Sequence, residues 1–597
     1  MVENAHRYGS LLLKGDWYAT ACTMAAGSVA GESAAGGEAA ASRAVRHLTA
    51  GEIERLIADG NRALSWSDLL VAVDFLPDFV IGNLFIGPCI LGRFAPEAGE
   101  AAESQLGEAR LPSGIYHCTL DRAIIESGAA LHRCPLVSGY RIAGCATVAD
   151  STLVFEGVCS FANGMSVPAG NESGGRQVTI HADMTLNEAR EAAERTSTDR
   201  QQPGDIRATL GFVGPYSRLS ACTRISNTFV GGYTKLVGAQ LVDESTLLST
   251  RDEVTTVCSG AIVRSSILQP GVSVTDCAIV DHSLLLEHSH ADRHAKVTGS
   301  IIGPNSGIGE GEVTASFVGP FVGFHHQALL IAAFWPEGKG NIGYGANVGS
   351  NHTSRRPDQE LRPGEGMFFG LGCNIKYPAN FHASPYSIVA TGVSTLPQRL
   401  SMPFSLIVEP ETHPEGVPGG LCLLRPAWVL SDNLYMVWRS RMKYRERNQA
   451  RRNAIPNEVF RDEIVAMMAA AAGALETAKG DRSIYTPLEI PEIGKNFVTE
   501  SDRAKAVQTY RFFVQFAGLA GLFANLPQSV SRQDRERYRE AVDYVAALVR
   551  ASREKDDERG GRIMDNYERT HVRAEFDPVV QDAAAWAAEE IARVGGA

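Results

Sequence analysis

The sequence lacks the patterns that mark membrane, disulfide-bonded and zinc-binding proteins. No apolar run reaches the roughly 18 residues that a spanning helix needs, and Leu11-Leu12-Leu13 is too short for a secretory apolar core. Its 11 cysteines stand singly, without a Cys-x-x-Cys pair. Such a set is typical of a reducing compartment. We therefore expect a cytoplasmic protein with no metal site and no membrane partner.

An excess of basic residues and a phosphate-binding loop are also missing. The net charge of the 597-residue chain is −12, which argues against a nucleic-acid partner. No predicted strand leads into G-x-G-x-x-G or a Walker loop, so we do not expect a nucleotidyltransferase. The length predicts more than one domain.

The first 80 residues precede the main repeat. Residues 1–45 include a stretch rich in Ala, Gly and Ser and are predicted to be flexible. Residues 46–79 are predicted to form a short helical cap. In this cap Thr49 and Glu52 form a capping box for a helix over 50–59, which Gly60 ends.

From about residue 80 to 410, single aliphatic residues recur every six positions. Examples are Val213, Leu219 and Ile225, then Leu268, Val274, Val280 and Leu286, then Ile302 and Ile308, and Ile342 and Val348. A period of six fits neither a helix nor a simple alternating strand. It indicates a solenoid with three short strands per turn and one inward side chain per hexad. A sandwich of short strands, the alternative, would show alternation and wider turn spacing.

Several segments interrupt or follow the repeat. We predict excursions from the solenoid at 95–112, 182–201, 331–341 and 352–366, the second of them helical. The last coil is expected to end near Val408. Residues 411–597 are predicted to be helical, with Ser431 capping the first helix and further helices near 456–478, 500–524, 531–553 and 578–594.

Long motifs in the chain resemble a known protein family. They are GNESGGR at 170–176, the stretch 310–353, PDQE at 357–360, PGEGMFFGLGCNIKYP at 363–378 and PAWVLSDNLYM at 426–436. They resemble a bacterial family of hexapeptide-repeat β-helix proteins described only as a domain of unknown function. The resemblance implies a mainly β fold: a left-handed parallel β-helix with helical insertions and an α-helical C-terminal domain.

More distantly, the repeat is similar to the acetyltransferase half of the bifunctional glucosamine-1-phosphate acetyltransferase/uridyltransferase. In that enzyme a His precedes an N-I-G-A-G element, and an Asn-Tyr pair follows it. Here His326 precedes Asn341-Ile342-Gly343-Tyr344-Gly345, and Asn351-His352 follows. The resemblance implies a general base at His326 and a sugar contact at Asn351; His352 departs from the expected Tyr.

Ionisable residues are predicted to gather at one corner of the solenoid. With Ala291, Val297, Ile302, Ile308, Val313, Val318 and Phe324 inward, His294, Glu310 and His326 fall at the same corner on successive coils. His352 would extend this column. An imidazole next to a carboxylate can act as a general base near neutral pH. Solvent-facing corner residues or a metal site are the alternatives.

Further residues are predicted to bind substrate. His325 and Asn341 flank the corner column, and Glu337 and Lys339 would form a polar rim with Asp358, Glu360 and Glu365. Glu172 and Arg176 form either a phosphate-binding loop or a structural pair. Basic residues from Arg439 to Arg452 form either a solvated helix face or a phosphate contact.

Three functions remain open on the sequence. The first is an acyltransferase that moves an acyl group from acetyl-CoA or another acyl-CoA to a sugar or nucleotide-sugar. The second is a non-catalytic solenoid that binds a sugar-phosphate or acts as a scaffold. The third is a metal-dependent lyase of the carbonic-anhydrase type. We also expect a homotrimer, because hexapeptide-repeat enzymes usually place sites between three-sided prisms.

Overall fold

The computed structural model describes residues 45–95, 103–106, 109–172, 176–195, 207–349, 361–478, 480–525 and 531–563. These residues form two compact units. The first unit contains the described residues up to Ala332 together with the segment Gln449–Ala454. The second contains the described residues of 333–448 and 455–563. Residues 1–44 of the predicted flexible segment lie outside the described part.

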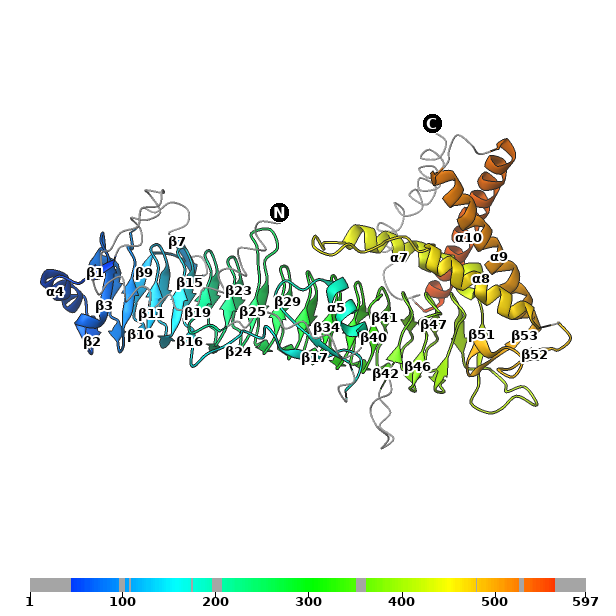
Figure 1. The fold of residues 1–597 in the computed structure, drawn as a ribbon, viewed down its shortest axis with the longest axis horizontal. Helices are drawn as coiled ribbons and strands as arrows, with labels where there is room; N and C mark the ends of the chain where they lie inside the picture. Colours follow the sequence, from blue (N-terminus) through cyan, green and yellow to red (C-terminus); the bar gives the residue numbers. More distant parts are fainter. Residues whose placement is uncertain are drawn as a thin grey trace. The chain divides into compact units, whose positions relative to one another are not determined.

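The first unit is a parallel β-solenoid, as the six-residue period predicts. Each coil contributes one strand to each of three faces, which we call the C, B and A faces in chain order, and Figure 1 shows the strands stacked as successive rungs. On the B face, Val263, Val280, Val297 and Val313 are register partners, 17, 17 and 16 residues apart. The mainly β fold is therefore confirmed, whereas its hand remains an expectation from the resemblance.

The strands of the first unit are short. The A face consists of β3 Leu69–Ala72, β6 Cys89–Leu91, β11 Ala123–Ile125, β14 Tyr140–Ile142, β19 Gly211–Val213, β22 Phe229–Val230, β25 Thr246–Leu247, β28 Ile267–Leu268, β31 Leu284–Leu285, β34 Ile301–Ile302 and β37 Phe317–Val318. The B face consists of β2 Arg62–Ala63, β5 Leu84–Phe85, β10 Thr119–Asp121, β13 Leu136–Ser138, β16 Thr152–Val154, β21 Arg224–Ser226, β24 Leu241–Asp243, β27 Ile262–Arg264, β30 Ile279–Asp281, β33 Lys296–Thr298, β36 Glu312–Thr314 and β39 Leu329–Ile331. The C face consists of β4 Val80–Ile81, β9 Gly114–Tyr116, β12 Ala130–His132, β15 Thr147–Ala149, β20 Arg218–Ser220, β23 Lys235–Val237, β26 Thr256–Cys258, β29 Ser273–Val274, β32 His290–Asp292, β35 Gly307–Gly309 and β38 Gly323–Phe324.

The core of these coils is built from the predicted inward positions. All of them are completely buried: Val213, Leu219, Ile225, Leu268, Val274, Val280, Leu286, Ala291, Val297, Ile302, Ile308, Val313, Val318 and Phe324. Stacking one aliphatic side chain on the next removes apolar surface from water on every coil. The register inferred from the sequence is therefore correct over this stretch.

A buried column of serines, which the apolar pattern did not predict, lines the corner between the B and A faces. The backbone N–H of Ser283 donates to Oγ of Ser266, and that of Ser300 donates to Oγ of Ser283, both at 3.1 Å. Each hydroxyl in turn donates to a carbonyl two residues earlier, as Ser283 does to Asp281 at 2.7 Å. The serines thus satisfy corner amides that the strand hydrogen bonds leave unpaired.

The predicted capping helix forms, but the solenoid begins earlier than residue 80. Helix α4 spans Ala50–Ala58, and its capping box joins Thr49 and Glu52 as expected. The rest of the predicted cap is not helical apart from two 3-10 turns, Trp66–Asp68 and Pro77–Phe79. Strands β2 and β3 already pair with β5 and β6, and β1 (Val45–His47) runs antiparallel to β3. A single coil of short strands shows too few repeats for the six-residue period to be recognised, so the sequence does not predict the first coil.

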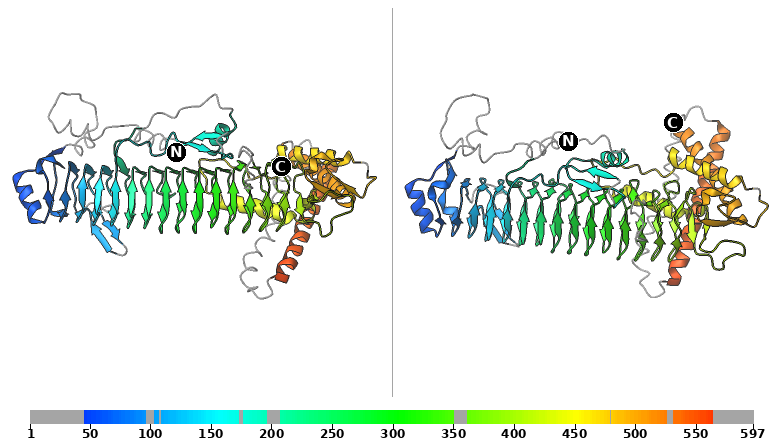
Figure 2. Two further views of the ribbon diagram at one scale, coloured as in Figure 1. Left: turned by 90° about the horizontal axis from the view of Figure 1, so that it is seen from below. Right: turned by 60° about the horizontal axis from the view of Figure 1, so that its bottom comes forward.

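Two insertions leave the first unit's coils. Within the predicted excursion 95–112, the described residues form an antiparallel hairpin, β7 Glu103–Leu106 with β8 Ala109–Pro112. The second insertion runs between β16 and β19 and contains the hairpin β17 Ser166–Pro168 and β18 Gln177–Thr179, followed by helix α5 Leu186–Glu194. Figure 2 shows it lying beside later coils, and the amide of Gly170 donates to the carbonyl of Ala315 at 2.9 Å. The helix predicted within 182–201 is confirmed.

The second unit also contains coils of parallel strands. Its strands are β40 Phe334–Trp335, β41 Asn341–Ile342, β42 Asn347–Val348, β43 Leu361–Arg362, β44 Phe368–Phe369, β45 Asn374–Ile375, β46 Ala379–Asn380, β47 Ile388–Val389, β48 Ser394–Thr395, β49 Gln398–Arg399 and β50 Leu406–Val408. The predicted end near Val408 is confirmed. The predicted excursion at 331–341 is wrong, because β40 lies within it, β41 begins at its last residue, and only 336–340 connect the two strands. Of the predicted excursion 352–366, residues 352–360 lie outside the described residues, and β43 lies in the remainder.

Helices follow these coils, together with three strands that the sequence analysis missed. The helices are α6 Trp428–Asp432, α7 Leu434–Arg447, α8 Asp462–Glu476, α9 Glu500–Asn525 and α10 Arg532–Ile563. The strands are β51 Cys422–Arg425, β52 Ile484–Tyr485 and β53 Asn496–Thr499. Ser431 lies inside α6, and Asn433 precedes α7, so the predicted cap is wrong. Among the described helices, none is long and apolar enough to cross a membrane.

Candidate functional site

The corner between the C and B faces brings Glu310 and His326 together in the first unit. Ala291, Ile308 and Phe324 are register partners on β32, β35 and β38, so the residues that follow them occupy this corner on successive coils. Nδ1 of His326 lies 2.9 Å from Oε2 of Glu310. The imidazole remains accessible, because the His326 side chain is 57% exposed. The predicted juxtaposition of these two residues is therefore confirmed.

The third member of the column is Arg293 rather than His294. His294 lies at the same corner and is exposed, but Nε of Arg293 is the group placed 3.7 Å from Oε1 of Glu310. The corner before β33 has one residue more than the corner before β36, which shifts the alignment by one position. The arginine guanidinium is always protonated, so it stabilises the ionised form of Glu310 at every pH. A histidine at this place would do so only when protonated.

Two glycines on the C face allow the side chains of His290 and Arg293 to lie flat on the next coil. A Cβ atom at position 307 would lie 2.3 Å from Nε2 of His290, and one at position 309 would lie 2.5 Å from Nη2 of Arg293. Only glycine permits such close approach. The G-I-G sequence of β35, with glycine at both outward positions of a strand, is the signal that the sequence analysis overlooked.

Charges around Glu310 favour its ionised form. The hydrogen bond from His326 lowers the pKa of the Glu310 carboxyl, and the positive charges of Arg293 and His325 add to this effect. The rings of His325 and His326 are 6.0 Å apart between centroids, and both side chains are exposed. An ionised carboxylate that accepts from Nδ1 orients the ring and leaves Nε2 to take up a proton.

Several predicted residues are not placed with this corner. Asn351 and His352, together with Asp358 and Glu360, lie outside the described residues. Asn341 is half-buried in β41 of the second unit, where its backbone amide donates to the carbonyl of Met367 at 3.0 Å. The roles assigned to these residues stay predictions.

Lys339 and Glu365 do not form the predicted polar rim. Lys339 is only 4% exposed and Glu365 only 5%, and Nζ of Lys339 donates to Oε1 of Glu365 at 2.8 Å. Arg461 also donates to this carboxylate, and the Tyr386 hydroxyl donates to it at 2.8 Å. Lys339 therefore belongs to a buried ion cluster inside the second unit, and a polar sequence was misinterpreted as a solvated one.

Glu337 lies next to this cluster but is less buried. Its side chain is 14% exposed, and Oε1 lies 3.9 Å from Nδ1 of His382. Its charge acts on Lys339. Burial lowers the pKa of the Lys339 ammonium below its usual value, and the carboxylates of Glu365 and Glu337 only partly oppose this. The contact of Glu337 with substrate stays a prediction.

Arg176 supports the insertion of the first unit. Its Nη1 donates to the carbonyl of Ala193 at 2.7 Å, near the end of α5. A cation at a helix C-terminus stabilises the helix dipole. This contact with a backbone carbonyl supports the structural interpretation of Arg176. Glu172 is half-buried.

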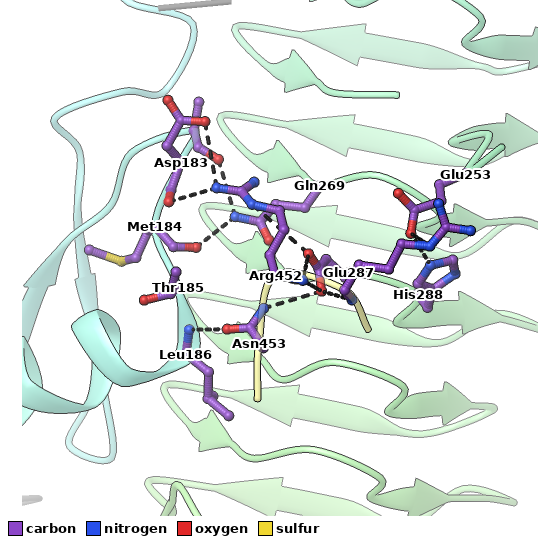
Figure 3. A network of polar contacts seen from close by, with 12 residues as sticks. Asp183, Met184, Thr185, Leu186, Glu253, Gln269, Glu287, His288, Arg452 and Asn453 are labelled. Carbon is purple, nitrogen blue, oxygen red and sulfur yellow. Dashed lines mark hydrogen bonds and ion pairs between the residues drawn. The ribbon is translucent and has the colours of Figure 1, made fainter. Parts of the chain in front are cut away.

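The basic run does not lie on a single helix. Residues Arg439 to Arg447 belong to α7, but Arg451 and Arg452 lie in the segment Gln449–Ala454, which is part of the first unit. There the amides of Arg451 and Arg452 donate to the Glu287 carboxylate at 3.1 and 2.9 Å (Figure 3). Glu287 is 1% exposed, so this carboxylate is a buried anchor for the segment.

Side chains of the same network secure the α5 insertion (Figure 3). Asn453 Oδ1 accepts from the amide of Leu186 at 2.7 Å, and Gln269 Nε2 donates to the carbonyl of Met184 at 2.7 Å. His288 Nε2 lies 2.9 Å from Glu253 Oε1, with both side chains almost buried, at 13% and 12% exposure. Because its groups bond to one another, the network serves to hold the insertion and the segment Gln449–Ala454 in place.

No compact metal site appears in the part of the chain that the structure describes. There, no group of three or more His, Cys, Asp or Glu residues is arranged to hold a metal ion. The imidazole, carboxylate and guanidinium at the Glu310–His326 corner can transfer a proton and bind an anion.

Comparison with known proteins supports the family resemblance. The chain is 25% identical over 467 residues to an uncharacterized protein of Treponema pallidum (strain Nichols). The match covers 73% of this chain and 62% of that relative, so the chain spans less than two thirds of the relative's length. Residues 45–425 match the model of a domain of unknown function, DUF4954. This match takes in most of the solenoid and more than half of the chain, and the protein therefore belongs to the DUF4954 family.

Proposed function

We propose that the corner at Glu310 and His326 is the general-base centre of an acyltransferase. The observation that carries the proposal is the 2.9 Å contact between Nδ1 of His326 and Glu310 across two coils, combined with an imidazole that is 57% exposed. The distant similarity to a hexapeptide-repeat acetyltransferase supports the same reaction class. The acceptor would be a sugar or nucleotide-sugar, and the donor an acyl-CoA.

The reaction needs one proton acceptor and no metal. His326 Nε2 removes the proton from an acceptor hydroxyl or amine as its oxygen or nitrogen attacks the thioester carbonyl. The carbon–sulfur bond breaks, a new ester or amide bond forms, and the proton passes from His326 to the departing thiolate. General-base catalysis of this kind is worth about 10²–10⁴ in rate.

Glu310 and Arg293 position the base in this proposal. The pKa of Glu310 is lowered first by the hydrogen bond with His326, so the carboxylate is available to hold the ring. Arg293, held flat by Gly309, keeps the carboxylate from turning away. Both residues act through His326, and their loss should reduce kcat more than KM.

The test is a turnover assay with acetyl-CoA and a panel of amino sugars and nucleotide-sugars, with acetylated product detected by mass spectrometry. His326→Ala should lower product formation at least about a hundredfold, since the base is lost. His282→Ala is the matched control. His282 is also 57% exposed and also contacts a carboxylate, Asp281 at 2.7 Å, but it lies at the corner between the B and A faces.

The outcomes separate the proposal from a binding scaffold. Equal activity of wild type and His326→Ala would contradict the catalytic assignment. Thermal stabilisation by acetyl-CoA without any product from the whole panel would favour a non-catalytic binding solenoid.

We also propose that the chain assembles as a homotrimer, on the resemblance to hexapeptide-repeat enzymes. Light scattering should give a mass close to three times 64.1 kDa. A stable monomer at micromolar concentration would remove this proposal and leave the corner assignment standing.

A further inference from the structure

Two tyrosines stack at the corner between the A and C faces of the first unit. The rings of Tyr216 and Tyr233 are 5.0 Å apart between centroids and inclined by 13°. They stack because Arg218 and Lys235 are register partners, and each tyrosine precedes its partner by two residues. Tyr216 is 48% exposed, which is unusual for a large aromatic side chain in a rigid scaffold.

The preceding coils leave one face of the stack open. In the same register, Cys145 and Gly128 occupy the corner below Tyr216, since Thr147 pairs with Arg218 and Ala130 with Thr147. Neither side chain is large enough to cover a tyrosine ring. As far as the described coils are concerned, the outer face of Tyr216, whose side chain is 48% exposed, is accessible to a planar ligand.

Three cations lie near this corner in the fold. Arg218 and Lys235 point outward from adjacent strands of the C face, about 4.8 Å apart. Arg251 lies in a corner loop of eight residues, 248–255, where the next coil uses only four, 269–272. Arg251 in this longer loop acts electrostatically on Tyr216. Burial and the Cys145 thiol raise the pKa of Tyr216, the thiol most strongly, and the Arg251 charge opposes that rise.

These cations lack the carboxylates that other solenoid cations have. Arg133 pairs with Asp150, Arg264 with Asp281 and Lys296 with Glu312. Within the described residues, no ion pair involves Arg218, Lys235 or Arg251. Like charges directly opposite each other on neighbouring strands are destabilising. An acidic chain of net charge −12 thus maintains a local positive patch at a cost in stability.

We propose that Tyr216, Tyr233, Arg218, Lys235 and Arg251 form a binding site for a nucleoside phosphate. The base stacks on the open face of Tyr216, and the phosphates bind the three cations. Stacking on an aromatic ring accepts any base, and the cations neutralise phosphate charge. Either feature alone would fit many ligands, but a planar ring bearing phosphates uses both. The proposal does not depend on a reaction at His326.

Isothermal titration calorimetry of the full chain tests the site with ADP, UDP, adenosine and inorganic pyrophosphate. ADP or UDP should bind, and adenosine and pyrophosphate should each bind about tenfold more weakly or worse, because each lacks one half of the contacts. Raising the salt concentration should weaken ADP binding and leave adenosine binding unchanged.

Two variants separate the contributions of ring and charge. Tyr216→Leu should weaken ADP about tenfold and leave pyrophosphate unchanged. Lys235→Gln should weaken ADP and pyrophosphate and leave adenosine unchanged. The matched controls are Tyr344→Leu, at a tyrosine that is 55% exposed in the second unit, and Lys296→Gln, at an exposed lysine on the B face. Both should bind ADP as wild type does.

Three results would overturn the proposal. They are no heat of binding with ADP or UDP at millimolar concentration, equal affinity for ADP and pyrophosphate, and equal weakening by the control variants. Circular dichroism of each variant shows whether it is folded, and if Tyr216→Leu fails to fold, Lys235→Gln decides alone.

Discussion

The corner at Glu310 in the first unit and the cluster at Glu365 in the second contain the same kinds of groups in opposite surroundings. Each carboxylate contacts an arginine and one further basic side chain. The Glu310 side chain is 35% exposed and that of Glu365 only 6%. Removing a partner of Glu310 costs little free energy, because water solvates that carboxylate. Removing a partner of Glu365 would leave a charge in a medium of low dielectric constant.

This difference separates residues that are available for chemistry from residues that hold the chain together. His326 has a free path to solvent and one fixed partner, which suits a base. Lys339 donates to Glu365 and to the carbonyl of Pro456, and Arg461 binds the same carboxylate. A cluster whose members all bond to the Glu365 carboxylate joins a turn of the solenoid to Arg461, which precedes α8, within the second unit.

The largest expected effect is at Glu365. Glu365→Ala should lower the free energy of unfolding by about 3–5 kcal/mol, because Lys339 and Arg461 would remain buried without their counter-ion. Urea unfolding followed by circular dichroism measures the change. A loss below about 1 kcal/mol would mean that water reaches the cluster and that the comparison fails.

A second prediction concerns acid and a buried histidine of the first unit. His132 is 4% exposed and stacks on Tyr116 at 4.7 Å, and among the described residues its Nε2 has no hydrogen-bond partner. Burial lowers the pKa of His132 to about 4. Between about pH 6.5 and pH 4, His132 is therefore protonated in the unfolded chain and neutral in the folded chain.

Acid therefore destabilises the folded chain through His132. The stabilising effect of neutral His132 is complete above pH 6.5 and is lost as the pH falls to about 4, at a cost of about 3 kcal/mol. Urea unfolding at pH 7 and pH 4 should therefore show a smaller loss for His132→Phe than for wild type. His326→Ala should lose as much as wild type, and an equal loss in all three proteins would refute the prediction.

A third, smaller effect is expected in the serine column. Ser283→Ala removes the hydroxyl that accepts from the Ser300 amide at 3.1 Å, and both residues are fully buried. Leaving that amide unpaired should lower the free energy of unfolding by about 1–2 kcal/mol. Ser273→Ala, at a half-buried serine on the C face, is the control and should change it less. Equal values would show that water replaces the hydroxyl inside the solenoid.

The smallest effect on stability is expected at the proposed active corner. Glu310→Gln should change the free energy of unfolding by about 0.5 kcal/mol or less, since exposed ion pairs contribute little. The same substitution should lower turnover, because a neutral amide holds the His326 ring less firmly. If Glu310→Gln instead destabilises the protein as strongly as Glu365→Ala, the corner is a structural element.

Much of the fold followed from one regularity in the sequence. The six-residue aliphatic period predicted the parallel solenoid, its inward residues and its end near Val408, because each coil must bury the same kind of side chain against the next. The capping box at Thr49 and the main C-terminal helices were predictable for a similar reason. Capping hydrogen bonds and amphipathic spacing depend only on residues that are close together in the sequence.

The tertiary structure decided which polar residues meet. The pattern placed Glu310 and His326 at one corner, but a one-residue difference between two turns exchanged His294 for Arg293. The same limit applied to Lys339, which a polar stretch of sequence suggested to be exposed and which is buried by Glu365 and Arg461 from distant segments. Apolar residues repeat because every coil needs them, whereas a charged residue is placed by partners that lie far away in the chain, and no local period encodes those partners.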